Sequence, residues 1–119
     1  MEMTLYNSEL HVMNVLWREG DCTARHIADI LAGEIGWNKN TTYTVLKRCI
    51  AKGAIQRSDP HFVCHALVAQ ADVQAAETDE LIDRLFDGSA DKLFASLLGR
   101  GRLSPQEIEK LKQLVRDLE

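Results

Sequence analysis

Apolar residues at the start of the chain recur with the spacing of an amphipathic helix. A first helix over residues 7–18, capped by Asn7 or Ser8, is predicted by Leu10, Met13, Leu16 and Trp17. After a break at Gly20, Thr23 is expected to cap a second helix, whose apolar stripe is Ala24, Ile27, Ala28 and Leu31. Residues 33–36 end this helix, so the pattern predicts two helices joined by a turn.

Residues 36–53 predict a third helix with one apolar and one polar face. The apolar stripe consists of Thr42, Val45, Leu46, Cys49 and Ile50. The opposite face collects Asn40, Thr44, Lys47 and Ala51, flanked by Thr41 and Arg48. No acidic residue occurs from Ile35 through Ser58. Amide and hydroxyl groups followed by cations suit a helix in the DNA major groove, and a basic face that only contacts solvent is the alternative.

The segments around this helix predict a winged helix. The linker before it is short, which is typical of a helix-turn-helix with the later helix exposed. After it, residues 54–57 and 62–67 alternate as strands on either side of a turn at 58–61. We therefore predict a winged-helix DNA-binding domain over residues 1–68. Because Arg57 is the one cation near the tip, we expect the wing to contribute weakly.

Residues 69–119 predict three further helices, at 72–86, 91–98 and 104–118. Ser104, Pro105 and Glu107 form a capping box with proline at the first helical position. Three short helices cannot bury all their apolar stripes, so we expect this segment to be a dimerisation module. Its predicted contact residues are Leu81, Leu85, Phe86, Leu93, Phe94, Leu97, Leu98, Ile108, Leu111 and Val115. The fold class is thus mostly α with a small β-hairpin.

Charge is unevenly distributed along the chain. The net charge is -4, but residues 1–68 balance seven basic against seven acidic residues, whereas residues 69–119 carry seven against eleven. Five cations form a local basic patch in the first part: Lys39, Lys47, Arg48, Lys52 and Arg57. Local patches rather than net charge attract phosphates, so the acidic total does not exclude nucleic acid.

The candidate DNA contacts divide by chemistry. Asn40, Thr41 and Thr44 are predicted to meet base edges. Lys39, Lys47, Arg48 and Lys52 are predicted to meet phosphates, and Arg57 lies at the base of the wing. Arg25 either contacts the backbone or pairs with Asp29 one helical turn later. Trp17 and Trp37 are expected to anchor the core.

Other function classes find little support in the sequence. With no long apolar run and no basic-then-apolar N-terminus, neither a membrane span nor a signal peptide is indicated, and we expect a cytoplasmic protein. No phosphate loop or nucleophile motif is present, so we expect a non-enzyme without cofactor or metal. Two alternatives stay open: a winged helix that binds a protein, and a thiol-based redox regulator using Cys22, Cys49 or Cys64.

Several motifs in this order and spacing resemble the penicillinase-repressor family of bacterial winged-helix regulators, which includes BlaI, MecI and CopY. The resemblance rests on the E-x-x-x-M-x-x-x-W pattern of residues 9–17 and on residues 23–28, 37–42, 46–48, 52–53, 67–68, 85–89 and 103–108. It implies a homodimer that binds a palindromic operator and represses a promoter until a signal releases it.

The resemblance also implies possible release routes, from which this chain departs. Antibiotic-responsive members are cleaved at an Asn-Phe bond through a membrane sensor-protease, whereas the matching residues here are Ser96 and Leu97. CopY-like members bind metal through C-terminal cysteines, and this chain has no cysteine after Cys64. An upstream sensor or protease is therefore an expected partner of undefined kind.

Overall fold

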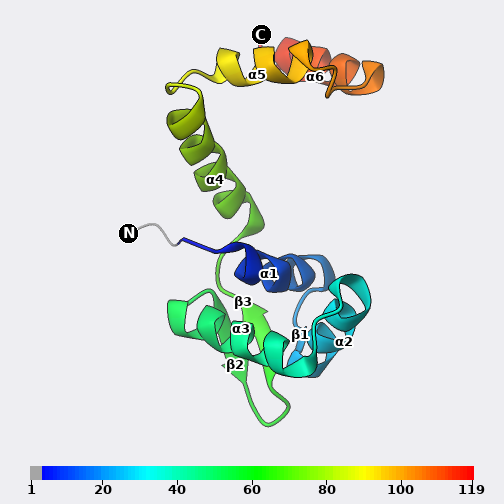
Figure 1. Ribbon diagram of the computed structural model, residues 1–119, viewed down its shortest axis with the longest axis vertical. Coiled ribbons are helices and arrows are strands. Elements are labelled where there is room, and N and C mark those ends of the chain that lie inside the picture. Colours follow the sequence, from blue (N-terminus) through cyan, green and yellow to red (C-terminus); the bar gives the residue numbers. More distant parts are fainter. Residues whose placement is uncertain (1–3) are drawn as a thin grey trace. The chain divides into compact units, whose positions relative to one another are not determined.

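The computed structural model describes residues 4–119, which form six helices and three short strands (Figure 1). The helices are α1 (Asn7–Glu19), α2 (Ala24–Ile35), α3 (Lys39–Lys52), α4 (Gln70–Leu85), α5 (Ala90–Gly99) and α6 (Pro105–Asp117). The strands are β1 (Cys22–Thr23), β2 (Ile55–Ser58) and β3 (Val63–Ala66). The chain divides into two compact units at Ala76 and Glu77, inside α4.

Hydrogen bonds to side-chain oxygens explain where the first three helices begin. Thr23 caps α2 as predicted, because its hydroxyl accepts the N–H of His26 at 3.1 Å. Asn38 caps α3 in the same way through the N–H of Thr41, at 2.8 Å. For α1 the predicted cap is wrong: the N-cap is Tyr6, whose N–H is bound at 2.8 Å by the carboxylate of Glu9. A carboxylate in the first turn thus replaces a polar side chain at the cap.

The apolar stripe predicted for α3 is confirmed. Thr42, Val45, Leu46 and Cys49 are buried, and Ile50 is half-buried. They pack with the apolar stripes of α1 and α2 into one core. The helix ends at Gly53, which adopts the left-handed backbone conformation with φ 83° that glycine adopts without strain.

The predicted hairpin is confirmed in β2 and β3, and β1 extends it to a three-stranded antiparallel sheet in the order β1-β3-β2. β2 and β3 pair with Ile55 opposite Ala66 and Ser58 opposite Val63. β1 adds two residues to the other edge of β3, where Cys22 lies opposite Cys64. The sheet therefore ties the start of α2 to the wing.

Both tryptophans lie at the edge of the core, as predicted. Trp17 is partly buried, and its indole N–H donates to the carbonyl of Val68 at 2.9 Å. Trp37 is partly buried and meets the ring of His11 edge to face, with ring centres 5.6 Å apart. The indole of Trp17 thereby fixes the segment that follows the wing.

The second unit contains no buried residue among those described in α4, α5 and α6. Leu98 is 55% exposed and Val115 57% exposed. The predicted capping box of α6 is confirmed, since Ser104 accepts the N–H of Glu107 and Glu107 accepts the N–H of Ser104. Every helix in the described residues is too short or too polar to cross a bilayer.

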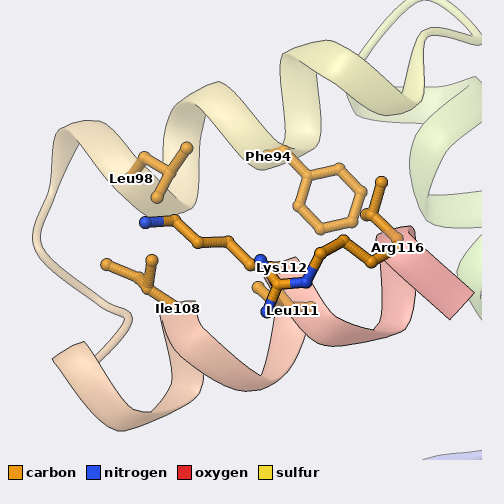
Figure 2. Close-up of a pocket in the computed structure, with 7 residues that line it drawn as sticks. Phe94, Leu98, Ile108, Leu111, Lys112 and Arg116 are labelled. Carbon is orange, nitrogen blue, oxygen red and sulfur yellow. The ribbon is translucent and has the colours of Figure 1, made fainter.

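An apolar groove of about 540 Å³ lies between α5 and α6. Figure 2 shows the side chains that line it, with Lys112 and Arg116 among apolar neighbours. The apolar lining residues are Phe94, Leu98, Ile108, Leu111 and Val115. All five belong to the set predicted to mediate dimerisation.

Candidate nucleic-acid interface

The polar face of α3 is exposed in its first three turns. Asn40, Thr44 and Lys47 are all exposed, as the helical period requires when Val45 and Leu46 are buried. Asn40 makes no side-chain hydrogen bond with any residue that the structure describes. Its amide keeps both a donor and an acceptor, the pair of groups that asparagine uses to bind adenine in the major groove.

The two threonine candidates are already engaged within the helix. Thr41 donates its hydroxyl to the side-chain oxygen of Asn38 at 3.1 Å, so it supports the N-cap. Thr44 donates its hydroxyl to the carbonyl oxygen of Asn40 at 2.9 Å. Thr44 therefore presents a lone pair and a methyl group outward, and it has no proton to donate.

Three cations of the predicted basic patch form no ion pair with an acidic residue in the described part of the chain. Lys47 is exposed and has no ion pair among the described residues. The ammonium of Lys39 lies 5.5 Å from the ring centre of Tyr43. Arg48 donates from Nη2 to the hydroxyl of Ser8 at 2.9 Å. None of the three is bound by a carboxylate of the described residues, so all three are available near the polar face of α3.

Lys52 forms an ion pair with a buried carboxylate. Its Nζ lies 2.6 Å from Oε1 of Glu9 and 2.7 Å from the carbonyl oxygen of Thr4, and the Glu9 side chain is fully buried. Burial acts to raise the pKa of Glu9, but the hydrogen bonds from Lys52 and from the N–H of Tyr6 outweigh it and lower that pKa. The charge of Lys52 is thereby neutralised within the fold.

The two remaining candidates differ in their surroundings. Arg57 is bound by the carboxylate of Asp59 at 3.0 Å and stacks on the ring of Phe62 at 3.7 Å, so its charge is partly compensated. Arg25 is exposed, and the alternative ion pair with Asp29 is not formed in the described chain. Of the five cations in the predicted patch, the structure thus leaves Lys39, Lys47 and Arg48 beside the polar face.

The family model for the penicillinase repressor matches residues 5–117 of this chain. The chain belongs to the penicillinase repressor family. The match spans both compact units and confirms the resemblance found in the sequence motifs.

Individual relatives of this penicillinase repressor family member cover most of its length. The methicillin resistance regulatory protein MecI of Staphylococcus aureus is 25% identical over 92% of this chain and 90% of MecI. The penicillinase repressor of Bacillus licheniformis is 25% identical over 93% of this chain and 88% of that repressor. These matches place the chain among repressors, a class without enzymatic activity.

A solved structure is similar to part of this chain. The monomeric form of Bacillus licheniformis BlaI in complex with the blaP half-operator is 26% identical and has a TM-score of 0.52. The likeness covers 60% of this chain and 90% of the BlaI chain. It confirms the predicted winged-helix fold of this family member.

The three thiols of this repressor are poorly reactive toward oxidants. Cys49 and Cys64 are fully buried, and burial raises the pKa of each thiol to about 11. Burial, together with the nearby carboxylate of Glu19, also raises the pKa of Cys22. Oxidants attack thiolates, which are scarce at neutral pH under these conditions. Residues 4–119 also contain no group of three side chains arranged to bind a metal.

Two residues of this interface, Asn38 and Ser8, were not predicted from the sequence to belong to it. Asn38 caps α3, and its position directly before the first helical residue was an available signal. Ser8, which was considered only as a cap, binds Arg48 across 40 positions of sequence. No local pattern reports a contact between residues that far apart.

Proposed function

We propose that this chain represses transcription by binding a palindromic operator as a homodimer, with α3 of each copy in a major groove. The observation that carries the proposal is the exposed face of α3, where Asn40 has a free amide and Lys47 a free ammonium. Protein two-fold symmetry and operator symmetry go together in helix-turn-helix repressors. The complex of BlaI with a half-operator supports one half-site for each copy.

We assign different roles to the residues of α3. Asn40 is the leading candidate to read a base, and Thr44 offers its methyl group to a thymine methyl. Lys39, Lys47 and Arg48 are assigned to phosphates, whereas Thr41 and Lys52 hold α3 in place. Arg25 is exposed near the start of α2 and stays a candidate for a backbone contact, and Arg57 contributes little while Asp59 compensates it.

Dimerisation is assigned to the second unit. The groove between α5 and α6 and the exposed apolar residues around it leave a surface that a second copy would cover. Such a repressor acts on the chromosome, so we place it in the cytoplasm. Ser96 and Leu97 lie inside α5, so a sensor-linked protease acting at that bond needs the helix to unwind first.

The test is to select DNA fragments from the source genome with the purified protein and to measure binding of variants to the selected duplex. Asn40→Ala is expected to lose about 1–3 kcal/mol of discrimination at one base pair. Lys47→Ala is expected to weaken binding to all sequences alike and to lower the salt slope by about one. Lys110→Ala, the same charge change on α6, serves as the matched control.

Two results would contradict the proposal. Equal losses for Asn40→Ala and Lys47→Ala on selected and random DNA would overturn the assignment of roles. Selection of no DNA, together with a partner complex that does not weaken as salt rises, would favour the alternative in which the winged helix binds a protein.

A further inference from the structure

Two cations of α3, Lys39 and Arg48, lie on its flanks, whereas Lys47 shares the face of Asn40 and Thr44. At about 100° per residue, Arg48 is turned about 80° from Asn40 toward one side, and Lys39 lies about 100° away on the other. A helix with its side chains is about 10–12 Å wide and the major groove about 12 Å. The two phosphate backbones that border the groove therefore run along these two flanks.

The flank that carries Arg48 is hollow. An open cleft of about 390 Å³ lies between the first turn of α1 and the first three turns of α3. We call it the α1–α3 cleft, and its lining consists of Ser8, Trp37, Asn38, Asn40, Thr41, Thr44, Val45 and Arg48. None of the residues that line it in the described chain is acidic.

The cleft contains donors that no protein group uses. One N–H of Arg48 binds the Ser8 oxygen at 2.9 Å, which holds the guanidinium at the cleft. Its other N–H groups make no hydrogen bond or ion pair with the described residues. Because Ser8 accepts from Arg48, its own hydroxyl proton is free to donate. A guanidinium beside a hydroxyl donor, with no carboxylate in the lining of the cleft, is suited to a phosphate oxygen.

We propose that the α1–α3 cleft binds one phosphate of the DNA backbone between Ser8 and Arg48. This inference rests on the proposed function, and it adds Ser8 of α1 to the residues that contact DNA. The partly buried Trp37 also lines the cleft and supplies an apolar wall against which the adjoining deoxyribose packs. A contact of this kind fixes the angle at which α3 enters the groove and carries no sequence preference.

The first test measures binding to a mixed-sequence duplex of about three helical turns over a series of salt concentrations. Ser8→Ala is expected to weaken binding about two- to fivefold, and Ser8→Glu at least about tenfold, because a new carboxylate faces the phosphate. Asn14→Glu is the matched control, since Asn14 is exposed on the same helix but lies outside the cleft. It is expected to change affinity less than about twofold. Thermal unfolding of each variant establishes that it is folded.

The second test places a single neutral methylphosphonate at successive positions of the selected operator duplex. At one position, neutralisation is expected to weaken binding of the wild type but to leave Arg48→Ala and Ser8→Ala unchanged. If Ser8→Glu and Asn14→Glu have equal effects, or if no phosphate position behaves in this way, the cleft does not bind a phosphate. The proposed function would still stand in either case, provided that the wild type binds the operator duplex. A wild type that binds no duplex would instead overturn the proposed function.

Discussion

The pair formed by Glu9 and Lys52 joins residues 43 positions apart and connects the first turn of α1 to the last turn of α3. Oε1 of Glu9 is shared between Lys52 and the N–H of Tyr6, whereas Oε2 is buried without a partner among the described residues. A buried carboxylate is costly unless it is paired. The fold therefore depends on Lys52 to keep Glu9 charged.

This pair makes stability depend on pH in the acidic range. The pKa of Glu9 is lowered below 4.5 in the folded state. The stabilisation that the Glu9 carboxylate gives the fold is therefore complete above the pKa of the unfolded state, and it is lost as pH falls through the pKa of the folded state. We expect the free energy of unfolding to decline below about pH 4.5, and Glu9→Gln to be less stable at pH 7 and to lack this part of the decline. Urea unfolding at several pH values measures both effects.

The control for this prediction is Glu109→Gln, which removes an exposed carboxylate of α6. Its pH dependence should match that of the wild type closely. Identical pH profiles for Glu9→Gln and the wild type would show that Glu9 does not cause the acid sensitivity.

Single residues also mark the limit of what the sequence could predict about the site. The exposure of Asn40 and Lys47 follows from the helical period, because the buried stripe fixes the opposite face. The engagement of Lys52 by Glu9 and of Arg48 by Ser8 does not follow, since each contact spans at least 40 positions. Charge alone predicted five available cations, whereas Glu9 engages Lys52 and Asp59 engages Arg57, so three remain beside the polar face.

At the scale of elements, the N-cap of α3 controls the turn that carries Asn40. The side-chain oxygen of Asn38 accepts both the N–H and the hydroxyl of Thr41. Asn40 lies in the same first turn. Fraying of this turn would disorder the amide that is proposed to read a base.

Replacing the cap should separate stability from DNA binding. Asn38→Ala is expected to cost about 1 kcal/mol of stability, whereas Asn38→Asp keeps a capping oxygen and the stability. Asn38→Asp should nevertheless weaken DNA binding, because its charge lies beside the phosphate backbone. Urea unfolding and duplex titration measure the two properties, and equal losses of stability in the two variants would contradict the capping role.

The elements themselves were predicted to different degrees. The six helices follow from apolar stripes and from caps such as Thr23 and Ser104. β1 was not predicted, because two residues are too few to show the alternation of apolar and polar positions that indicates a strand. This strand is defined by its pairing with β3. The cap of α1 was misplaced because the Glu9 carboxylate, rather than the residue at the cap, binds the orphan N–H.

At the scale of the whole molecule, the two units differ in how they bury apolar surface. The first unit has a core of fully buried side chains, including Met13, Leu16 and Ile27. The second unit leaves Phe94 44% exposed and Leu98 55% exposed beside an open groove. A single chain therefore completes one core and leaves the other surface open.

A charge introduced into the groove between α5 and α6 should dissociate the proposed dimer into monomers. Val115→Asp is expected to yield a monomer at micromolar concentration and to weaken full-operator binding about 100-fold, while half-site binding is kept. Gln106→Asp, at an exposed position of the same helix outside the groove, should stay dimeric. Analytical ultracentrifugation and operator titration report these results, and a dimeric Val115→Asp with normal affinity would place the interface elsewhere.

The open apolar surface of the second unit has a consequence for gene dosage. If only the dimer occupies an operator, then well below the dimer dissociation constant the dimer concentration varies as the square of the monomer concentration. Halving the monomer concentration therefore leaves about a quarter of the dimers. A promoter governed in this way responds to a modest dilution of its regulator, such as cell growth without new synthesis, with a disproportionate rise in transcripts.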